Sequence, residues 1–216
     1  MRYNTFIIMK EVSRMKILVT GFEPFGGESV NPSWLAVSRL PEEVPGAQIV
    51  KKQLPVVWFK ALDILKDYIE AEKPDVVMMC GQAGGSDAMR IERVGINLCE
   101  ASIPDNEMVQ LFGVPIDPEG PAAYFSTFPY GPMLEAAQAT GVPTRFSYSA
   151  GAYLCNHVLY GCLRLAEQQY PDLRAGFIHV PFLPEQVTDK KPGTPSMPLD
   201  GIARVLLAFV ETIAKN

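Results

Sequence analysis

Several features that often reveal the class of a protein are absent from this chain of 216 residues. No uninterrupted apolar stretch approaches the roughly 18 residues that a membrane-spanning helix requires. The 24 Asp and Glu residues outnumber the 19 Lys and Arg residues, and the cations form no basic stripe of the kind that binds nucleic-acid phosphates. We therefore expect neither a membrane nor a nucleic-acid partner for this protein.

Cysteine and histidine are also scarce, with four and two residues respectively. The cysteines form no C-x-x-C pair, and Cys155 with His157 lacks two further ligands at a spacing that would suit zinc. A chain of this length can bury a sufficient core without disulfides. These counts predict no metal site and give little support to a disulfide framework.

The first 14 residues lie outside the clear pattern of secondary structure. Residues 6–9 are too few for the apolar core of a signal peptide, and no small-residue cleavage site follows them. Met15 opens the first convincing strand. We expect residues 1–14 to be an N-terminal extension that is a candidate for disorder, residues 15–216 to be a single domain, and the protein to reside in the cytoplasm.

Short apolar segments alternate with amphipathic segments along the rest of the chain. Runs of apolar and β-branched residues predict strands at 16–20, 48–54, 76–80, 92–98, 144–148 and 176–180. Helical periodicity with Pro or Gly boundaries predicts helices at about 31–40, 55–73, 133–140, 153–169 and 199–214. This order, without an internal repeat or a linker, predicts one α/β domain around a mostly parallel sheet.

Ligands of such sheets bind beyond the carboxyl ends of the strands, where two glycine-rich loops are expected. The first, G-F-E-P-F-G-G at 21–27, has no Lys or Arg and matches neither phosphate-binding motif. Its Phe22 and Phe25 would offer apolar walls to a small neutral ring, or would pack in the core. The second, G-Q-A-G-G at 81–85, has an amide donor and acceptor in Gln82, or is a plain turn.

A third loop, S-A-G-A-Y-L-C-N-H, places Cys155 in the first turn of a predicted helix. The start of a helix favours the thiolate form of a cysteine and offers backbone N–H groups to an oxyanion. The alternative is a buried structural cysteine, the role expected for Cys80, Cys99 and Cys162. Cys155 is therefore a candidate nucleophile.

A nucleophilic cysteine requires a base, and the chain has two histidines. His157 lies about 200° around the helix from Cys155, whereas His179 lies at the carboxyl end of the last buried strand. A carboxylate that orients His179 would complete the arrangement. The residues alone leave five candidates open: Glu92, Glu23, Asp105, Glu107 and Glu185.

These motifs, taken in order, resemble the pyroglutamyl-peptidase I family, also called pyrrolidone-carboxylate peptidases. The resemblance is carried by G-F-E-P-F-G-G with N-P-S-W, G-Q-A-G-G with I-E-R-V-G-I-N, I-P-D-N-E, G-P-A-A-Y, S-A-G-A-Y-L-C-N-H and H-V-P-F-L-P-E-Q, from Met15 to the C-terminus. It implies a cytosolic cysteine peptidase that removes N-terminal pyroglutamate from peptides. It further implies a three-layer α/β/α sandwich, a homotetramer, and no metal or cofactor.

The resemblance also assigns residues. It implies a triad of Glu92, Cys155 and His179 that acts through a thioester acyl-enzyme. It implies a pyrrolidone pocket made of Phe22, Phe25, Asn31, Gln82, Ile103, Tyr153 and Leu154. One departure stands out, because Ser102 occupies the place of an arginine in the A-R-I-P-D-N pattern of the family. Either backbone N–H groups stabilise the oxyanion without it, or Arg90 or Arg93 takes its place.

Two other functions remain as alternatives from the residues. A nucleoside phosphorylase or a similar α/β transferase would share the layered architecture, but it needs an anion site rich in Arg or Ser. The acidic G-F-E-P-F-G-G loop disfavours such a site. A non-catalytic lactam-binding module would share the pocket, and would bind its ligand without turnover.

Overall fold

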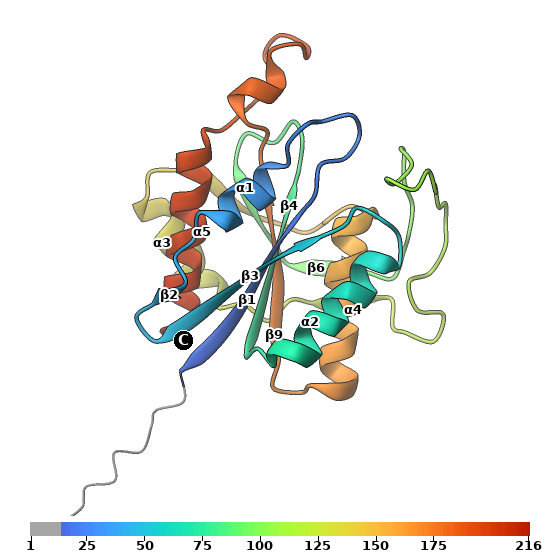
Figure 1. Cartoon of the computed structure of the whole chain (residues 1–216), viewed down its shortest axis with the longest axis vertical. Coiled ribbons are helices and arrows are strands. Elements are labelled where there is room, and N and C mark those ends of the chain that lie inside the picture. Colours follow the sequence, from blue (N-terminus) through green and yellow to red (C-terminus); the bar gives the residue numbers. More distant parts are fainter. Residues whose placement is uncertain (1–13) are drawn as a thin grey trace, which may run out of the picture.

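The structure of the protein is a computed structural model, which describes residues 14–216 (Figure 1). Residues 1–13 of the extension expected at 1–14 lie outside this range. Arg14 is described, and its guanidinium pairs with the Glu43 carboxylate at 2.6 Å. The first strand begins at Met15, as predicted.

A seven-stranded sheet forms the centre of the molecule. Its order is β2 (Glu43–Val44), β3 (Ala47–Leu54), β1 (Met15–Phe22), β4 (Val76–Gln82), β9 (Arg174–Val180), β5 (Met89–Glu92) and β8 (Thr144–Ser147). Strands β3, β1, β4 and β9 are parallel to their neighbours in this series, and β5 is parallel to β8. Only the β2–β3 and β9–β5 pairs of this sheet are antiparallel. The predicted mostly parallel sheet is confirmed.

Helices cover both faces of this sheet (Figure 1). One face carries α1 (Pro32–Ser38), α3 (Tyr130–Ala139) and α5 (Leu199–Ile213), and the other carries α2 (Lys60–Glu72) and α4 (Leu154–Gln169). Successive residues of a strand point to opposite faces, so Ile17 joins one apolar cluster and Leu18 the other. The three-layer α/β/α sandwich is therefore confirmed.

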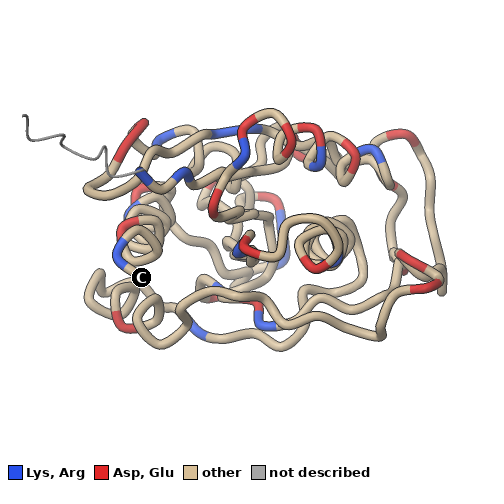
Figure 2. Tube along the Cα trace, turned by 90° about the horizontal axis from the view of Figure 1, so that it is seen from below, with Lys and Arg blue, Asp and Glu red and all other residues tan. Residues whose placement is uncertain are grey.

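Lysines and arginines are interspersed with acidic residues along the chain trace (Figure 2). Within residues 14–216, no helix is both long enough and apolar enough to cross a membrane.

The strand predicted at 92–98 is wrong as a single element, because the chain changes sheets at Arg93. Strand β5 ends at Glu92, and β6 (Val94–Ile96) pairs instead with β7 (Ala123–Phe125) in a separate two-stranded sheet. The Arg93 N–H donates to the Ser147 carbonyl at the end of β8, whereas the Arg93 carbonyl accepts from the Ser126 N–H beside β7. The alternation of apolar and polar residues continues from β5 into β6. The sequence pattern therefore does not reveal that the chain changes sheets.

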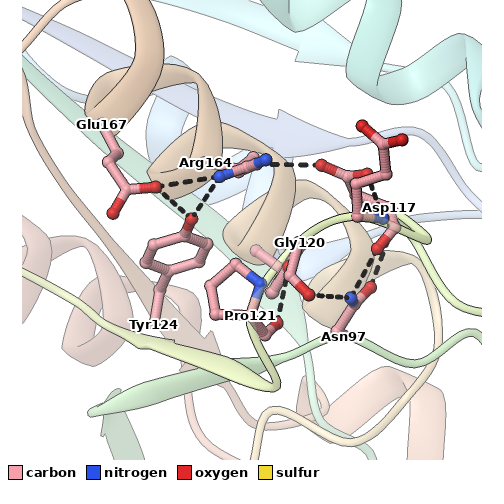
Figure 3. Close-up of polar contacts among 9 residues, drawn as sticks. Asn97, Asp117, Gly120, Pro121, Tyr124, Arg164 and Glu167 are labelled. Atoms are coloured by element: carbon pink, nitrogen blue, oxygen red, sulfur yellow. Dashed lines mark hydrogen bonds and ion pairs between the residues drawn. The ribbon is translucent and has the colours of Figure 1, made fainter.

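Side-chain hydrogen bonds attach the loop after β6 to helix α4 (Figure 3). Asn97 donates to the Asp117 carbonyl (2.6 Å) and accepts from the Asp117 N–H (2.9 Å). Arg164 of α4 donates to the Asp117 carboxylate (2.9 Å), to the Tyr124 hydroxyl (3.1 Å) and to Glu167 (3.0 Å). Hydrogen bonds from the Glu119 N–H and from Arg164 lower the pKa of Asp117, which keeps this loop anchor charged.

Asn156, the neighbour of Cys155, joins α4 to β6 from within the core. Its side chain is fully buried, and its oxygen accepts from the Ile96 N–H at 2.9 Å. Its nitrogen donates to the carbonyls of Ile96 (2.8 Å) and Leu98 (3.0 Å). The start of α4 is thereby fixed against the second sheet.

We expect Asn156→Ala to lower the free energy of unfolding by about 2–4 kcal/mol, because it removes three hydrogen bonds from a fully buried side chain to the backbone of Ile96 and Leu98. Urea denaturation would measure the change. Asn216→Ala is the matched control, since its exposed amide bonds a single helical carbonyl, and it should change stability little. Equal stabilities of the two variants would contradict this account.

Candidate active site

The pairing of β5 with β9 brings a buried carboxylate to a buried imidazole. Glu92 lies opposite Phe177 in the antiparallel register, and His179 lies two residues beyond Phe177 on the same face of the sheet. The Glu92 Oε1 atom is 2.8 Å from His179 Nδ1. Glu92 is 0% exposed and His179 only 6% exposed, so water does not weaken this contact.

Cys155 reaches the same place from helix α4. The helix begins at Leu154, and no side chain caps its N-terminus at Tyr153. The Cys155 sulfur lies above Gly81 of β4, the residue paired with His179 in the neighbouring strand. A Cβ atom at Gly81 would lie 2.7 Å from the sulfur, so glycine allows the thiol to approach the sheet beside His179.

Burial and neighbouring charge act in opposite directions on His179. Burial lowers the pKa of the imidazole, but the charge of the Cys155 thiolate and hydrogen bonds with Cys155 and Glu92 raise it to about 9. The net effect favours the imidazolium form at neutral pH. The site therefore stabilises a proton on His179, between a sulfur and a carboxylate.

The remaining cysteines and the second histidine lie in apolar surroundings. Cys80, Cys99 and Cys162 are buried, and burial raises the pKa of all three thiols, to about 11 in Cys99 and about 12 in Cys162. His157 packs edge-on against Trp58, and burial lowers the pKa of His157 to about 4. Cys155, by contrast, is partly exposed.

Of the five carboxylates that the sequence leaves open, the structure brings Glu92 to the imidazole. Glu23 and Asp105 accept backbone hydrogen bonds in neighbouring loops. Glu107 pairs with a lysine at 2.9 Å, and Glu185 is exposed. Among residues 14–216, no three His, Cys, Asp or Glu side chains are grouped to hold a metal ion.

A small cavity opens beside Cys155. It is lined by residues from the carboxyl ends of β1, β3 and β4 and from the start of α4: Phe22, Phe25, Asn31, Val56, Gln82, Tyr153, Leu154 and Cys155. Except for Ile103, every residue predicted for the pocket lies here. The lining is mostly aromatic and aliphatic, with two amides, and so suits a small neutral ligand.

The observed lining of the cavity differs from the predicted lining at two residues. Ile103 is not among the lining residues; it is 40% exposed and lies near Gly26. Val56 was not predicted, although it follows the carboxyl end of β3 and the same rule of strand ends would have found it.

Both arginines considered as replacements at Ser102 make contacts with other residues. The Arg90 side chain donates to the Ser86 hydroxyl at 3.0 Å. The Arg93 guanidinium stacks 3.8 Å above the centre of the Tyr130 ring. Ser102 itself is exposed.

Comparison with known proteins agrees with the sequence motifs. The family model described as pyroglutamyl peptidase matches residues 15–216. Pyrrolidone-carboxylate peptidases of Lactobacillus johnsonii and Thermosipho africanus are 46% and 47% identical over 202 residues, which is 94% of this chain and 94% and 98% of theirs. A crystal structure of Bacillus amyloliquefaciens pyroglutamyl peptidase I has a TM-score of 0.90 at 44% identity and covers 94% of this chain and 98% of its own.

We expect iodoacetamide to label Cys155 first in the folded protein, because the other three thiols are buried and held in their neutral form. Peptide mapping by mass spectrometry after partial alkylation would identify the site. In urea all four cysteines should react, which serves as the control for the chemistry. Early labelling of Cys99 in the folded chain would contradict the prediction.

Proposed function

The chain belongs to the pyroglutamyl peptidase family, and from that premise we propose that it cleaves the bond after an N-terminal pyroglutamyl residue through Cys155, His179 and Glu92. The protein is a pyroglutamyl-peptidase I, a hydrolase of the cysteine peptidase class. The observation that carries the proposed mechanism is the 2.8 Å contact between Glu92 and His179 beside the thiol of Cys155, at the mouth of an apolar cavity.

In the proposed reaction, Cys155 is the nucleophile. Its thiolate attacks the carbonyl carbon attached to the lactam ring and forms a tetrahedral oxyanion. His179, which holds the proton, gives it to the leaving amine as the C–N bond breaks, and a pyroglutamyl thioester remains. The neutral imidazole then takes a proton from water, and the resulting attack releases pyroglutamate and the thiol.

Glu92 acts through His179 and not on the substrate. Its carboxylate accepts from Nδ1 and so directs Nε2 of the imidazole toward the sulfur and the leaving group. It also stabilises the imidazolium. No side chain caps the start of α4, which supports the proposal that backbone N–H groups there stabilise the oxyanion without an arginine at Ser102.

The proposed pocket recognises the lactam by shape and by hydrogen bonds. Phe22 is the last residue of β1 and Phe25 lies in the loop that follows, and the Phe25 and Tyr153 rings are 6.2 Å apart between centroids. A pyroglutamyl ring is flat and uncharged, so aromatic walls can enclose it without an unpaired charge. The amide of Gln82 would then bond its polar edge, whereas the Asn31 amide caps α1 and donates to the Glu23 carbonyl.

The assembly and the location implied by the family, a homotetramer in the cytoplasm, are part of the proposal. Support for an assembly comes from exposed apolar side chains, of which Met108, Phe112 and Phe125 are each more than 70% exposed. Light scattering coupled to gel filtration would measure the mass in solution.

We expect Cys155→Ala to reduce the release of a reporter amine from a pyroglutamyl substrate by at least about 10³-fold, because the nucleophile is lost. Cys162→Ala, two turns along the same helix, is the matched control and should keep its activity. Lactam binding without turnover in the unaltered protein would indicate instead a non-catalytic binding module.

The pH profile tests the role of Glu92. The pKa of His179 is raised to about 9, so kcat/KM should decline above about pH 9, where the proton for the leaving amine is lost. Glu92→Gln removes a charge that raises this pKa, so its alkaline decline should begin at lower pH, and kcat should fall by about 10²–10⁴-fold. An alkaline limb at the same pH in both proteins would exclude this role.

A further inference from the structure

Gln186 is a buried amide that lies behind the pocket, in the short 3₁₀ helix η1 (Pro184–Val187) after β9. Its side chain is turned inward, and the residue is only 5% exposed. Its nitrogen donates to Gln82 Oε1 at 2.9 Å and to Glu28 Oε2 at 3.0 Å. Its oxygen accepts from the Leu183 N–H at 3.0 Å. All the polar atoms of this amide are therefore in use.

The partners of Gln186 allow one orientation of its amide. A carboxylate can only accept hydrogen bonds, so Glu28 requires the nitrogen of Gln186 to face it. A backbone N–H can only donate, so Leu183 requires the oxygen. Lys190 pairs with the other oxygen of Glu28 at 2.7 Å, and this contact holds the carboxylate in place. A flipped Gln186 amide would lose three hydrogen bonds.

The orientation of Gln186 decides that of Gln82. Because Gln186 donates to Oε1 of Gln82, the nitrogen of Gln82 is the atom left for the cavity that this residue lines. Among the described residues, this nitrogen has no hydrogen-bond acceptor. Gln82 therefore presents an N–H donor, and not an acceptor, to a ligand in the cavity.

We propose that Gln186 is a positioning residue that holds Gln82 with its amide nitrogen toward the pocket, so that the site selects rings carrying a carbonyl group. The inference rests on the proposed function, because it takes the cavity beside Cys155 as the lactam pocket. Gln186 also bonds Glu28, three residues beyond Phe25, and so connects the amide at the end of β4 with the aromatic loop. One side chain thereby fixes two walls of the pocket.

The first experiment measures recognition of the ring carbonyl directly. Cyclopentanecarbaldehyde and its ring-ketone derivative, with the carbonyl where the lactam has it, are neutral aldehydes that can add reversibly to Cys155. The native protein should bind the ketone more tightly, and in Gln186→Ala and Gln186→Glu this preference should fall by about 10-fold or more. If Gln186 had only a structural role, the variants would bind both aldehydes more weakly by the same factor, and this result would overturn the proposal.

Steady-state kinetics provide the second readout. In both variants we expect kcat/KM for a pyroglutamyl reporter to fall about 10–100-fold, mainly through KM, because the nucleophile and the base stay in place. Glu185→Ala is the matched control, since its exposed side chain lies in the same turn, and it should behave as the native protein. The rate of Cys155 alkylation and the thermal midpoint report whether the variants keep the fold.

A double variant separates failure of this inference from failure of the proposed function. If Gln186 acts through Gln82, adding Gln186→Ala to Gln82→Ala should change kcat/KM by less than about 2-fold. If Gln82→Ala alone leaves the ring-carbonyl preference intact, the proposed pocket is wrong and the inference falls with it. If Gln82→Ala abolishes the preference and Gln186→Ala does not, the pocket stands and the inference alone is overturned.

Discussion

The site depends on the antiparallel pairing of β5 with β9. In a sheet whose central strands are parallel, this reversal aligns Glu92 with Phe177 and brings its carboxylate within 2.8 Å of His179. Glu92 and His179 are 87 positions apart in the chain, so local sequence does not bring them together. Strand register sets their geometry, so the contact is as rigid as the sheet itself.

This pairing buries the charge of the Glu92 carboxylate away from water, which lowers the stability of the fold. Glu92 is fully buried, and its second oxygen has no hydrogen-bond partner among residues 14–216. Such a group destabilises the fold unless a neighbouring cation compensates it, which His179 can do when protonated. Because the folded-state pKa of His179 is raised, its stabilising contribution is present below about pH 6.5 and is lost as the pH rises through about 9.

Small residues and polar loops adapt the sheet edge to a ligand. Gly81 lets the Cys155 sulfur approach β4, and the cavity beyond it is walled by aromatic rings. Behind these walls, the hydrogen bonds of Gln186 determine which end of Gln82 faces the ligand. The Glu28 carboxylate, which can only accept, and the Leu183 N–H, which can only donate, leave the Gln186 amide a single orientation.

Sequence patterns alone determined the features that depend on neighbouring residues. Periodicity and boundary residues predicted the α/β class, and loop chemistry placed Cys155 at a helix start and His179 at a strand end. Tertiary structure decided what depends on distant pairing: which of five carboxylates meets the imidazole, where the chain leaves the main sheet at Arg93, and which way the Gln82 amide faces. The family resemblance also implied Glu92, whereas the residues of the sequence taken alone favoured none of the five carboxylates. The reason is physical, because local spacing fixes the direction of a side chain on its own element, whereas strand order and register alone determine which elements become neighbours.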